Sequence, residues 1–271
     1  MEHRFFRAIP MGNGVTRITD ISDVHCYLVE GTKKAILIDA LPGLRGLQDF
    51  VGTLTSLPVE VAATHGHLDH IGGIFEYGAC YLHPADIPLL EQDTAEARKG
   101  YVDSQVQNSV YTLEDFTVTC PVDCTPVADG EKIDLGGRRL EVLEVPGHTR
   151  GSVCYFDPGS GDFFAGDACN GNTLLLAAYS ATVGEYLEAL KRLKKRQAEI
   201  KTFHLFHAET PVENTVIDDN IGCCEDILNH RDDHIRVEFL NRVGYLAKER
   251  AGSRRKDGKF GNIMYSEELA R

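Results

Sequence analysis

Hydrophobic and polar positions alternate along much of the first 66 residues in the manner of β-strands. Residues 15–19 (VTRIT) and 24–30 (VHCYLVE) alternate apolar with polar side chains, and 35–40 (AILIDA) form a short apolar run typical of a buried strand. Apolar residues at helical spacing over 43–54 predict a helix, and the run 59–64 (VEVAAT) predicts another strand. The chain therefore begins with strands, continues with a helix and returns to a strand.

Short strands and helices also alternate through the rest of the chain. Val183, Leu187, Leu190 and Leu193 form one apolar stripe of an amphipathic helix. Residues 92–125 lack clear periodicity, and we expect them to form a lid or a pocket wall. The pattern predicts strands over 79–82, 139–145, 152–156, 162–167 and 202–207, and helices over 84–92, 182–197 and 213–229.

The order of these elements predicts the fold class. The sequence contains no internal repeat, low-complexity segment or linker that would separate two domains. A chain of 271 residues is long enough for one large α/β domain with a sizeable core. Strands and helices in both halves predict a sandwich of sheets with helices outside. We therefore expect a single domain over 1–271, with 213–271 as a C-terminal extension that packs near the functional site.

Charge narrows the choice of partner. The net charge of −13 repels phosphate backbones, so we expect a small-molecule substrate and no nucleic acid. The concentrated positive charge near the C-terminus, from Arg254 to Lys259, is interpreted as a solvated polar loop. No window of 18 apolar residues is present, so no membrane span is expected. The sequence leaves the oligomeric state open.

The eight cysteines are scattered along the chain, and no secretory signal precedes them. Cys26 and Cys154 lie in alternating apolar runs and are interpreted as small core residues. Cys120 and Cys124 have the spacing of a metal knuckle or a redox pair, but no second Cys/His pair follows at finger-like spacing. A reduced, cytoplasmic compartment fits this cysteine usage best.

Potential metal ligands are concentrated directly after the strand predicted at 59–64. The segment His65-Gly-His67-Leu-Asp69-His70 is followed by Gly-Gly, which marks a loop at the carboxyl end of a strand, where ligands collect in α/β sheets. His and Asp are costly to bury unpaired, so core packing is a poor explanation for this cluster. Histidines two residues apart can reach one metal, and the following Asp-His pair can point to a second.

Weaker pieces of the same pattern recur at the ends of later strands. His148 follows the strand predicted at 139–145 within Pro-Gly-His-Thr-Arg-Gly-Ser, and Asp167 follows an apolar run as Ala-Gly-Asp. His207 ends the predicted strand 202–207, whereas the competing candidate, His204, lies inside it. We therefore prefer His207 as the last ligand.

In order, THGHLDHIGG, PGHTRGS, AGD and a late strand-end histidine resemble the signature of the metallo-β-lactamase superfamily over about residues 15–210. The resemblance implies the four-layer αβ/βα sandwich. It implies that His65, His67 and His148 hold one divalent metal, that Asp69, His70 and His207 hold another, and that Asp167 bridges them. Leu37-Ile-Asp39 resembles the early aspartate that supports a ligand histidine in this family.

The metal chemistry follows from the ligand types. Zn²⁺ is the default for a mixed histidine and carboxylate site, and iron or manganese suits the same ligands. Two such ions activate a water and polarise a carbonyl or phosphoryl oxygen. Asp69 is the expected catalytic residue, which would orient the attacking water and pass on its proton. His25 and Tyr265 are candidate substrate contacts, with ordinary packing as the alternative for each.

Departures from known branches narrow the activity. True β-lactamases of the superfamily lack a bridging aspartate at the position of Asp167, and flavodiiron proteins carry Glu in place of His67. The resemblance therefore implies the glyoxalase II and lactonase-like branch, whose members hydrolyse a small ester, thioester or lactone. Alternatives are a small-nucleotide phosphodiesterase, a mononuclear-iron persulfide dioxygenase and a non-catalytic metal-binding sensor.

Overall fold

The computed structural model describes residues 3–107, 110–207, 210–239, 242–252 and 254–271. The chain divides into two compact units. Unit 1 comprises Met1–Glu141 and Phe206–Ala208, and unit 2 comprises Val142–Leu205 and Glu209–Arg271. Among the described residues, no helix combines the length and apolar character needed to cross a membrane.

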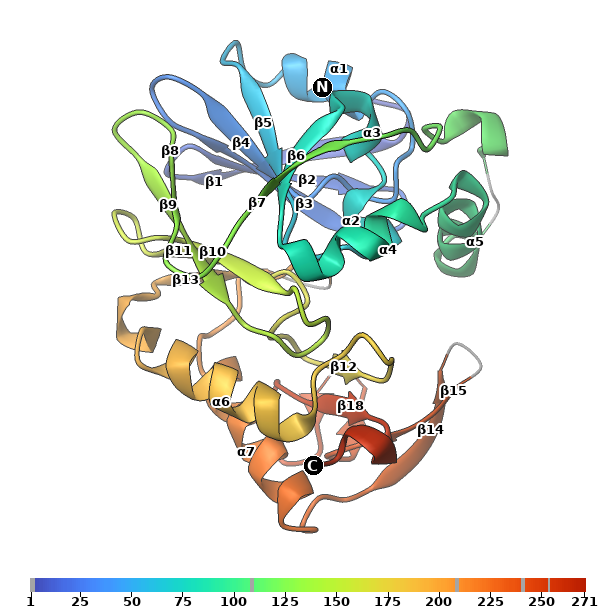
Figure 1. Cartoon of the computed structure of the whole chain (residues 1–271), viewed down its shortest axis with the longest axis vertical. Helices are drawn as coiled ribbons and strands as arrows, with labels where there is room; N and C mark the ends of the chain where they lie inside the picture. The colour runs from blue at the N-terminus through green and yellow to red at the C-terminus, as the bar shows by residue number, and fades with distance from the viewer. Residues whose placement is uncertain (1–2, 108–109, 208–209, 240–241, 253) are drawn as a thin grey trace. The chain divides into compact units, whose positions relative to one another are not determined.

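A seven-stranded sheet forms the frame of unit 1, in the order β1-β2-β3-β4-β5-β6-β7 (Figure 1). The first four strands pair antiparallel, and the pairs from β4 to β7 are parallel. The pairing changes from antiparallel to parallel at β4, where the connections between strands become longer. Antiparallel neighbours can be joined by a short hairpin, whereas parallel neighbours need a crossover segment. The strands are β1 (Phe6–Gly12), β2 (Val15–Asp20), β3 (His25–Glu30), β4 (Ala35–Ile38), β5 (Val59–Ala62), β6 (Ala79–Leu82) and β7 (Asp123–Pro126).

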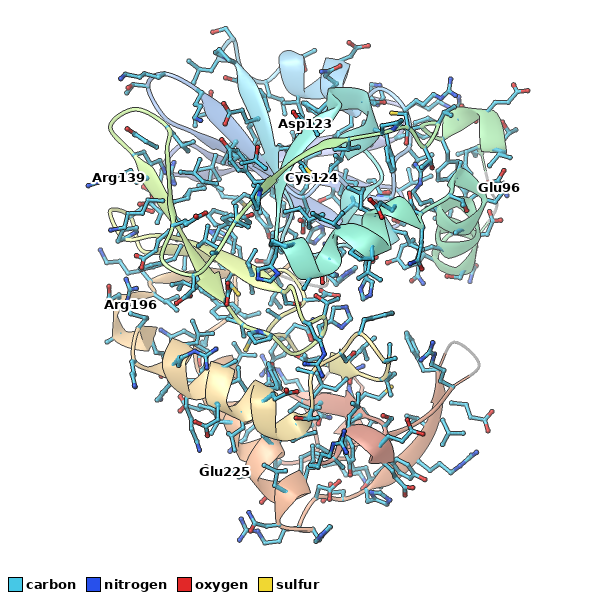
Figure 2. The ribbon with its side chains drawn as sticks, viewed as in Figure 1. Glu96, Asp123, Cys124, Arg139, Arg196 and Glu225 are labelled. Carbon is cyan, nitrogen blue, oxygen red and sulfur yellow. The ribbon has the colours of Figure 1, made fainter. Side chains whose placement is uncertain are left out.

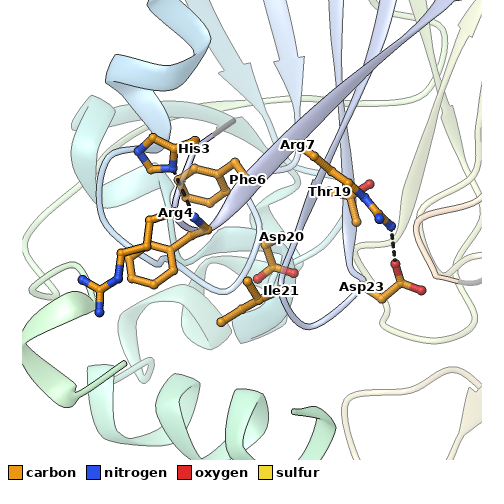
Figure 3. Close-up of a pocket in the computed structure, with 9 residues that line it drawn as sticks. His3, Arg4, Phe6, Arg7, Thr19, Asp20, Ile21 and Asp23 are labelled. Atoms are coloured by element: carbon orange, nitrogen blue, oxygen red, sulfur yellow. Dashed lines mark hydrogen bonds and ion pairs between the residues drawn. The ribbon is translucent and has the colours of Figure 1, made fainter. Parts of the chain in front are cut away.

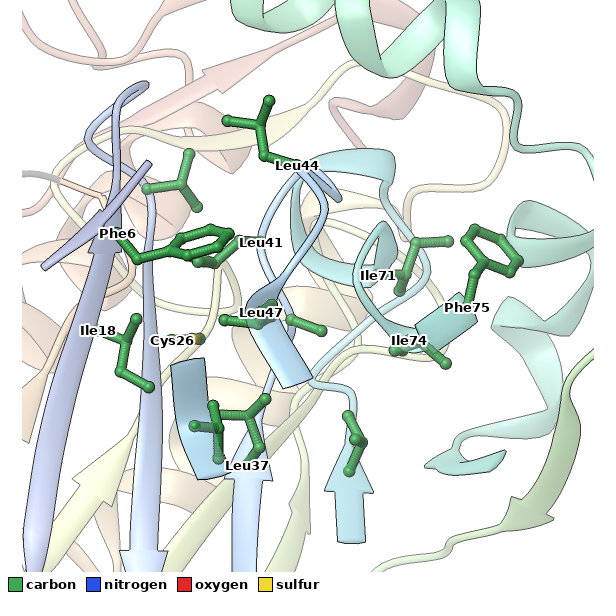
Figure 4. Packing of buried hydrophobic residues seen from close by; sticks show 14 of the residues in the cluster. Phe6, Ile18, Cys26, Leu37, Leu41, Leu44, Leu47, Ile71, Ile74 and Phe75 are labelled. Carbon is green, nitrogen blue, oxygen red and sulfur yellow. The ribbon is translucent and has the colours of Figure 1, made fainter. Parts of the chain in front are cut away.

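Helices supply the crossovers of unit 1 and help to enclose its core. Phe6, Ile18 and Leu37 from the sheet share one buried cluster with Leu47 of α1 and Ile74 of α3 (Figure 4). β4 is buried along its whole length, as expected for a strand that is covered on both faces. The helices are α1 (Leu47–Gly52), α2 (Leu68–Ile71), α3 (Ile74–Tyr77), η1 (Pro84–Asp86), α4 (Ile87–Glu91), α5 (Ala95–Gln105) and η2 (Leu113–Asp115). A short hairpin of β8 (Lys132–Asp134) with the start of β9 (Arg139–Glu144) completes the unit.

Among the described residues, unit 2 contains three groups of strands, the smallest being the pair β16-β17, and two long helices. The end of β9 continues into the unit, where the strand order is β13-β11-β10-β9. A second, four-stranded sheet has the order β12-β18-β15-β14. Helices α6 (Val183–Lys194) and α7 (Val216–Leu228) pack against each other in Figure 1 and share one apolar core. The remaining elements are β10 (Val153–Asp157), β11 (Asp162–Phe164), β12 (Thr173–Leu175), η3 (Gln197–Glu199), β13 (Thr202–His204), β14 (Ile235–Phe239), β15 (Arg242–Leu246), β16 (Arg250–Ala251), β17 (Arg254–Arg255), β18 (Ile263–Tyr265) and η4 (Glu267–Leu269).

The elements predicted from periodicity are confirmed, most of them with shorter bounds, whereas β2 is one residue longer and β6 has the predicted bounds. The stripe from Val183 to Leu193 is buried on α6, which begins after a capping box formed by Thr182 and Glu185. The predicted strand 202–207 ends at His204, so His207 lies beyond it. Helix α5 was not predicted, because only Arg98 and Val102 are buried on it and no apolar stripe marks it.

The segment 213–271 is not an appendage to unit 2. Ile217, Cys224 and Ile263 belong to the same buried cluster as Phe163 and Leu190. The C-terminal residues therefore contribute core side chains to the unit that contains residues 142–205.

Candidate metal centre

The first potential ligands lie where β5 ends and α2 begins. His67 stands at the N-terminus of α2 in an extended conformation, and Asp69 and His70 lie within the helix. Gly72 follows, and a Cβ atom there would lie 2.3 Å from the carbonyl carbon of Pro42. A glycine is therefore needed directly after this helix, because a larger residue would push the ligand-bearing turn away from the chain that precedes α1.

Asp69, His70 and His207 come together in unit 1. One potential ligand atom from each lies within 4.8 Å of the others. The Nε2 atoms of His70 and His207 are 3.1 Å apart, and both face Asp69 Oδ2, at 3.6 Å and 3.4 Å. Two ring nitrogens and a carboxylate oxygen that converge on one point are a donor set suited to a divalent cation.

Asp39 holds the opposite side of the His70 ring. Its Oδ2 lies 2.7 Å from Nδ1 of His70, and both side chains are fully buried. Burial raises the pKa of the Asp39 carboxyl, while His70 and the donors of Thr64 act in the opposite direction. With the carboxylate as acceptor, the proton of His70 lies on Nδ1, so the Nε2 lone pair points toward Asp69 and His207.

His65 and His67 extend the same cluster within unit 1. His65 Nε2 lies 3.1 Å from His67 Nδ1, and the ring centroids of His65 and His70 are 4.3 Å apart. Thr64 connects this pair to Asp39, because its hydroxyl contacts Asp39 Oδ2 at 2.8 Å and His65 Nδ1 at 3.0 Å. Thr64 was not identified from the sequence, although its place beside the first histidine was a usable signal.

Unit 2 holds the other two predicted ligands beside each other. His148 Nε2 lies 3.6 Å from Asp167 Oδ2, and His148 Nδ1 contacts the carbonyl of Leu174 in β12 at 2.9 Å. The tight turn before His148 depends on Gly147, where a Cβ would lie 2.4 Å from the ring of Tyr186. The carbonyl contact orients the His148 ring with Nε2 toward Asp167, in the way that Asp39 orients His70.

The choice between the two late histidines is decided by their neighbours. His204 is buried in β13, where Nε2 lies 2.9 Å from Asp162 Oδ1 and the ring stacks on Phe164. His207, by contrast, faces Asp69 and His70. The geometry therefore favours His207 as a ligand.

Two supporting residues carried no pattern that the sequence analysis used. Asp86 accepts a hydrogen bond from the backbone of Gly66 at 2.9 Å and so holds the loop between His65 and His67. Arg98, fully buried on α5, forms an ion pair with Asp93 at 2.8 Å and donates to the carbonyl of Gly72. Burial raises the pKa of Asp93 to about 6, against the effect of Arg98. Both residues act on backbone that adjoins the ligands.

His25 and Asp20 lie near each other at the ends of β3 and β2. His25 is buried, and its Nδ1 lies 3.0 Å from the hydroxyl of Thr19. Asp20 lines a recess of about 300 Å³ together with Phe6 and Ile21 (Figure 3). Burial raises the pKa of the Asp20 carboxyl to about 6. The contact of His25 with Thr19 is a local structural role, and its contact with substrate stays a prediction.

Tyr265 is also engaged within its own unit. It is buried in β18, its hydroxyl donates to Asp232 Oδ2 at 2.6 Å, and His234 Nδ1 lies 2.9 Å from the Tyr265 hydroxyl oxygen. Burial raises the pKa of the Tyr265 hydroxyl well above its usual value, with Asp232 acting in the same direction. These partners favour the packing role over a role as donor to a substrate.

The cysteines and the basic run have structural surroundings. Cys120 is exposed, whereas Cys124 on β7 (Figure 2) lies opposite Cys80, with 3.9 Å between the sulfur atoms. The cysteine beside Cys124 is thus Cys80, and not Cys120 as the spacing in the sequence allowed. The basic run is a solvated loop only in part, because Arg255 is buried against Gly261 and the thiol of Cys223.

The unpatterned segment 92–125 lines a second recess of unit 1, of about 590 Å³. Leu113, Phe116 and Val118 provide apolar wall there, and Leu113 and Val118 are exposed. Part of this segment thus lines a recess, as expected of a pocket wall, and the binding of a substrate in that recess stays a prediction.

A known protein family and several relatives match the sequence of this chain. The model of the metallo-β-lactamase superfamily matches residues 19–201. The acyl-coenzyme A thioesterase MBLAC2 of Gallus gallus is 28% identical over 207 residues, which are 70% of this chain and 75% of that protein. The human protein of the same name is 28% identical over 185 residues, 62% of this chain and 66% of that protein. A hydroxyacylglutathione hydrolase of Synechococcus sp. is 30% identical over 156 residues, 56% of this chain and 52% of that protein.

Solved structures match the fold. A metallo-β-lactamase family protein of Thermus thermophilus gives a TM-score of 0.57 at 22% identity, covering 83% of this chain and 80% of that one. A metallo-β-lactamase from Pontibacter korlensis gives a TM-score of 0.59 at 18% identity, covering 82% of this chain and 99% of that one. The predicted fold class is therefore confirmed.

Proposed function

The chain belongs to the metallo-β-lactamase superfamily and is a hydrolase of that group, and on this premise we propose that it uses two divalent metal ions to hydrolyse a small-molecule thioester, ester or lactone. The observation that carries the proposal is the convergence of Asp69, His70 and His207, with Asp39 fixing the orientation of the His70 ring. A degenerate, non-catalytic member would be expected to have lost some of these groups.

In this proposal the seven predicted ligands form two sets. His65, His67 and His148 would hold one ion, Asp69, His70 and His207 would hold the other, and Asp167 would serve both sets. Two observations support the fit: the ring nitrogens and carboxylates are the donor types that Zn²⁺ prefers, and His70 and His148 are each oriented through Nδ1. Iron and manganese suit the same donors, so the identity of the metal is part of what the experiment must establish.

The side chains have separate tasks in the reaction. Bound divalent ions supply a water of lowered pKa and polarise the oxygen of the scissile group. Asp69 orients the attacking water and holds its proton until the leaving group takes it. Asp39 keeps His70 in one tautomer, and the Leu174 carbonyl does the same for His148, so neither ring has to reorient during the reaction.

The substrate class is proposed from the relatives. Two of them carry the name of an acyl-coenzyme A thioesterase and another that of a hydroxyacylglutathione hydrolase. A thioester is therefore the first substrate to test, and the apolar wall that Leu113, Phe116 and Val118 give to an otherwise largely polar recess is a candidate position for an acyl group. Phosphodiester hydrolysis by the same metals, oxidation of a persulfide at one iron, and metal sensing without catalysis remain the alternatives.

The test is an anaerobic assay with the full-length protein, loaded in turn with zinc, manganese or iron after chelation. The panel contains acyl-CoA thioesters, lactones, a phosphodiester and a cephalosporin. We expect release of free thiol from a thioester without oxygen, and loss of this activity in Asp167→Ala at an unchanged unfolding temperature. Turnover of the phosphodiester alone, or turnover that consumes oxygen in a one-iron protein, would contradict the proposal.

A further inference from the structure

The four-stranded sheet of unit 2 ends in an outer strand. β14, residues Ile235–Phe239, pairs antiparallel with β15, and no other described strand lies beside it in the order β12-β18-β15-β14. Figure 1 shows β14 and β15 running side by side as a long hairpin. The outer edge of such a strand presents backbone N–H and C=O groups that can pair with another strand.

The hairpin also exposes large apolar side chains. Ile235 and Phe239 are each 37% exposed, and Val243 of β15 is 45% exposed. Proteins commonly protect an edge strand with charged side chains, above all lysine, with proline, with a bulge or with a covering segment. β14 contains no lysine or proline, its two charges, Arg236 and Glu238, have opposite signs, and its pairing with β15 runs without a register shift from Ile235 to Phe239. The strand is therefore regular, apolar at both ends and open to a partner.

The partner is indicated by the order of side chains along the strand. β14 has the sequence Ile235-Arg236-Val237-Glu238-Phe239. The central valine is flanked by two charges of opposite sign, and an apolar residue stands at each end of the strand. We propose that β14 pairs antiparallel with β14 of a second copy of this chain, with the two-fold axis at Val237.

This arrangement satisfies every position of the strand at once. Each Arg236 lies opposite Glu238 of the other copy, each Ile235 lies opposite Phe239 of the other copy, and the two Val237 residues face each other. Residues directly opposite one another in an antiparallel pair share a face, so the charges meet on one face and the apolar side chains on the other. Arg236 and Glu238 already lie 3.1 Å apart within one chain, so four charges of alternating sign would gather around the axis.

Charge also selects this register over its neighbours. A shift of two residues in one direction places Arg236 opposite Arg236, and a shift in the other direction places Glu238 opposite Glu238. A shift of one residue brings the charged face of one strand to the apolar face of the other. Only the register centred on Val237 is both charge-complementary and consistent with the two faces, as a two-fold symmetric interface requires.

The expected association is modest. A strand of five residues buries less surface than the roughly 1,600 Å² of a standard interface. We therefore expect a dimer that forms reversibly as the protein concentration is raised through the micromolar range, independently of the metal centre.

The test is sedimentation velocity of the full-length protein, from roughly 1 to 200 μM, a range that covers a micromolar Kd. Arg236→Glu and Glu238→Arg each create two like-charge pairs across the axis, and each should raise the dimer Kd at least ~10-fold. An equimolar mixture of these two variants should dimerise like the unaltered protein, because every carboxylate then faces a guanidinium of the other copy.

The mixture of the two variants distinguishes pairing between chains from a loss of local stability within each chain. Both variants lack the ion pair within the strand, and mixing does not restore it, so recovery of the dimer can come only from pairing between chains. Lys191→Glu, which disrupts an exposed ion pair with Glu188 on α6, is the matched control and should leave the Kd unchanged. A monomer at all concentrations, or a dimer that neither single variant weakens, would overturn the proposal.

Discussion

At the residue scale, buried aspartates fix the tautomers of buried histidines, and two such pairs with different neighbours occur among the residues that the structure describes. Asp39 contacts His70 at 2.7 Å, beside Asp69 and His207. Asp162 contacts His204 at 2.9 Å, among the strands of unit 2. Asp39 was singled out from the sequence because Leu37-Ile-Asp39 resembles the early aspartate motif of the family. Asp162 was not, because no pattern in the sequence connects it to a histidine 42 positions later.

The two pairs give a matched test of the role of Asp39. In Asp39→Asn the amide oxygen still accepts from the Thr64 N–H, so an NH2 group takes the place of the oxygen that faces Nδ1 of His70, and we expect metal binding to weaken by roughly 10–100-fold. Asp162→Asn makes the same change of atoms at an equally buried site and should leave metal affinity unchanged. Metal affinity is measured by competition with a chromophoric chelator, and the unfolding temperature of each variant is recorded in parallel. Equal losses of affinity in both variants would show that Asp39 acts through stability alone.

At the element scale, prediction succeeded where an element carries an apolar run or an apolar stripe and failed where it does not. The strands from 15 to 62 were recognised by such runs, although β3 and β4 are buried on both faces, and the apolar stripe of helix α6 matches its burial. Helix α5 buries an arginine, Arg98, whose partners Asp93 and Thr117 come from outside the helix, so its sequence lacks an apolar stripe. β14 is exposed on both faces apart from its central residue, β15 is only partly buried, and the buried strand β18 has three residues, so none of them shows a usable alternation.

The C-terminal strand β18 has a larger structural role than an added pocket wall would have. It lies between β12 and β15, and Leu174 of β12, whose carbonyl contacts His148, is paired with Met264. The support of a predicted metal ligand therefore runs through the C-terminal strand.

Truncation after Gly252 tests this role. Because it removes the buried Ile263 and Tyr265 from the core of unit 2, we expect loss of cooperative unfolding together with loss of bound metal. Tyr265→Phe keeps the strand and removes only the hydroxyl contacts with Asp232 and His234, so it should retain both metal and kcat/KM. A truncated protein that keeps its metal but loses activity would contradict this expectation and would indicate that the C-terminal segment contacts the substrate.

At the scale of the whole molecule, the seven predicted ligands are distributed over both units. Five of them, His65, His67, Asp69, His70 and His207, belong to unit 1, and His148 and Asp167 belong to unit 2. All seven could be proposed from the sequence because they stand in local motifs at the ends of predicted strands and those motifs resemble the signature of the superfamily. It did not reveal the division into units, since no linker or change of composition marks it, and His207 returns to unit 1 from a stretch of chain that otherwise belongs to unit 2.

The central claim is that these residues bind two metal ions, and the metal content of the full-length protein tests it most directly. The protein is purified without chelator, supplemented in turn with zinc, iron or manganese, and freed of loosely bound ions before elemental analysis. Two complete ligand sets predict about two ions per chain. A reproducible value near one ion per chain, with no gain on adding any of the three metals, would contradict the account.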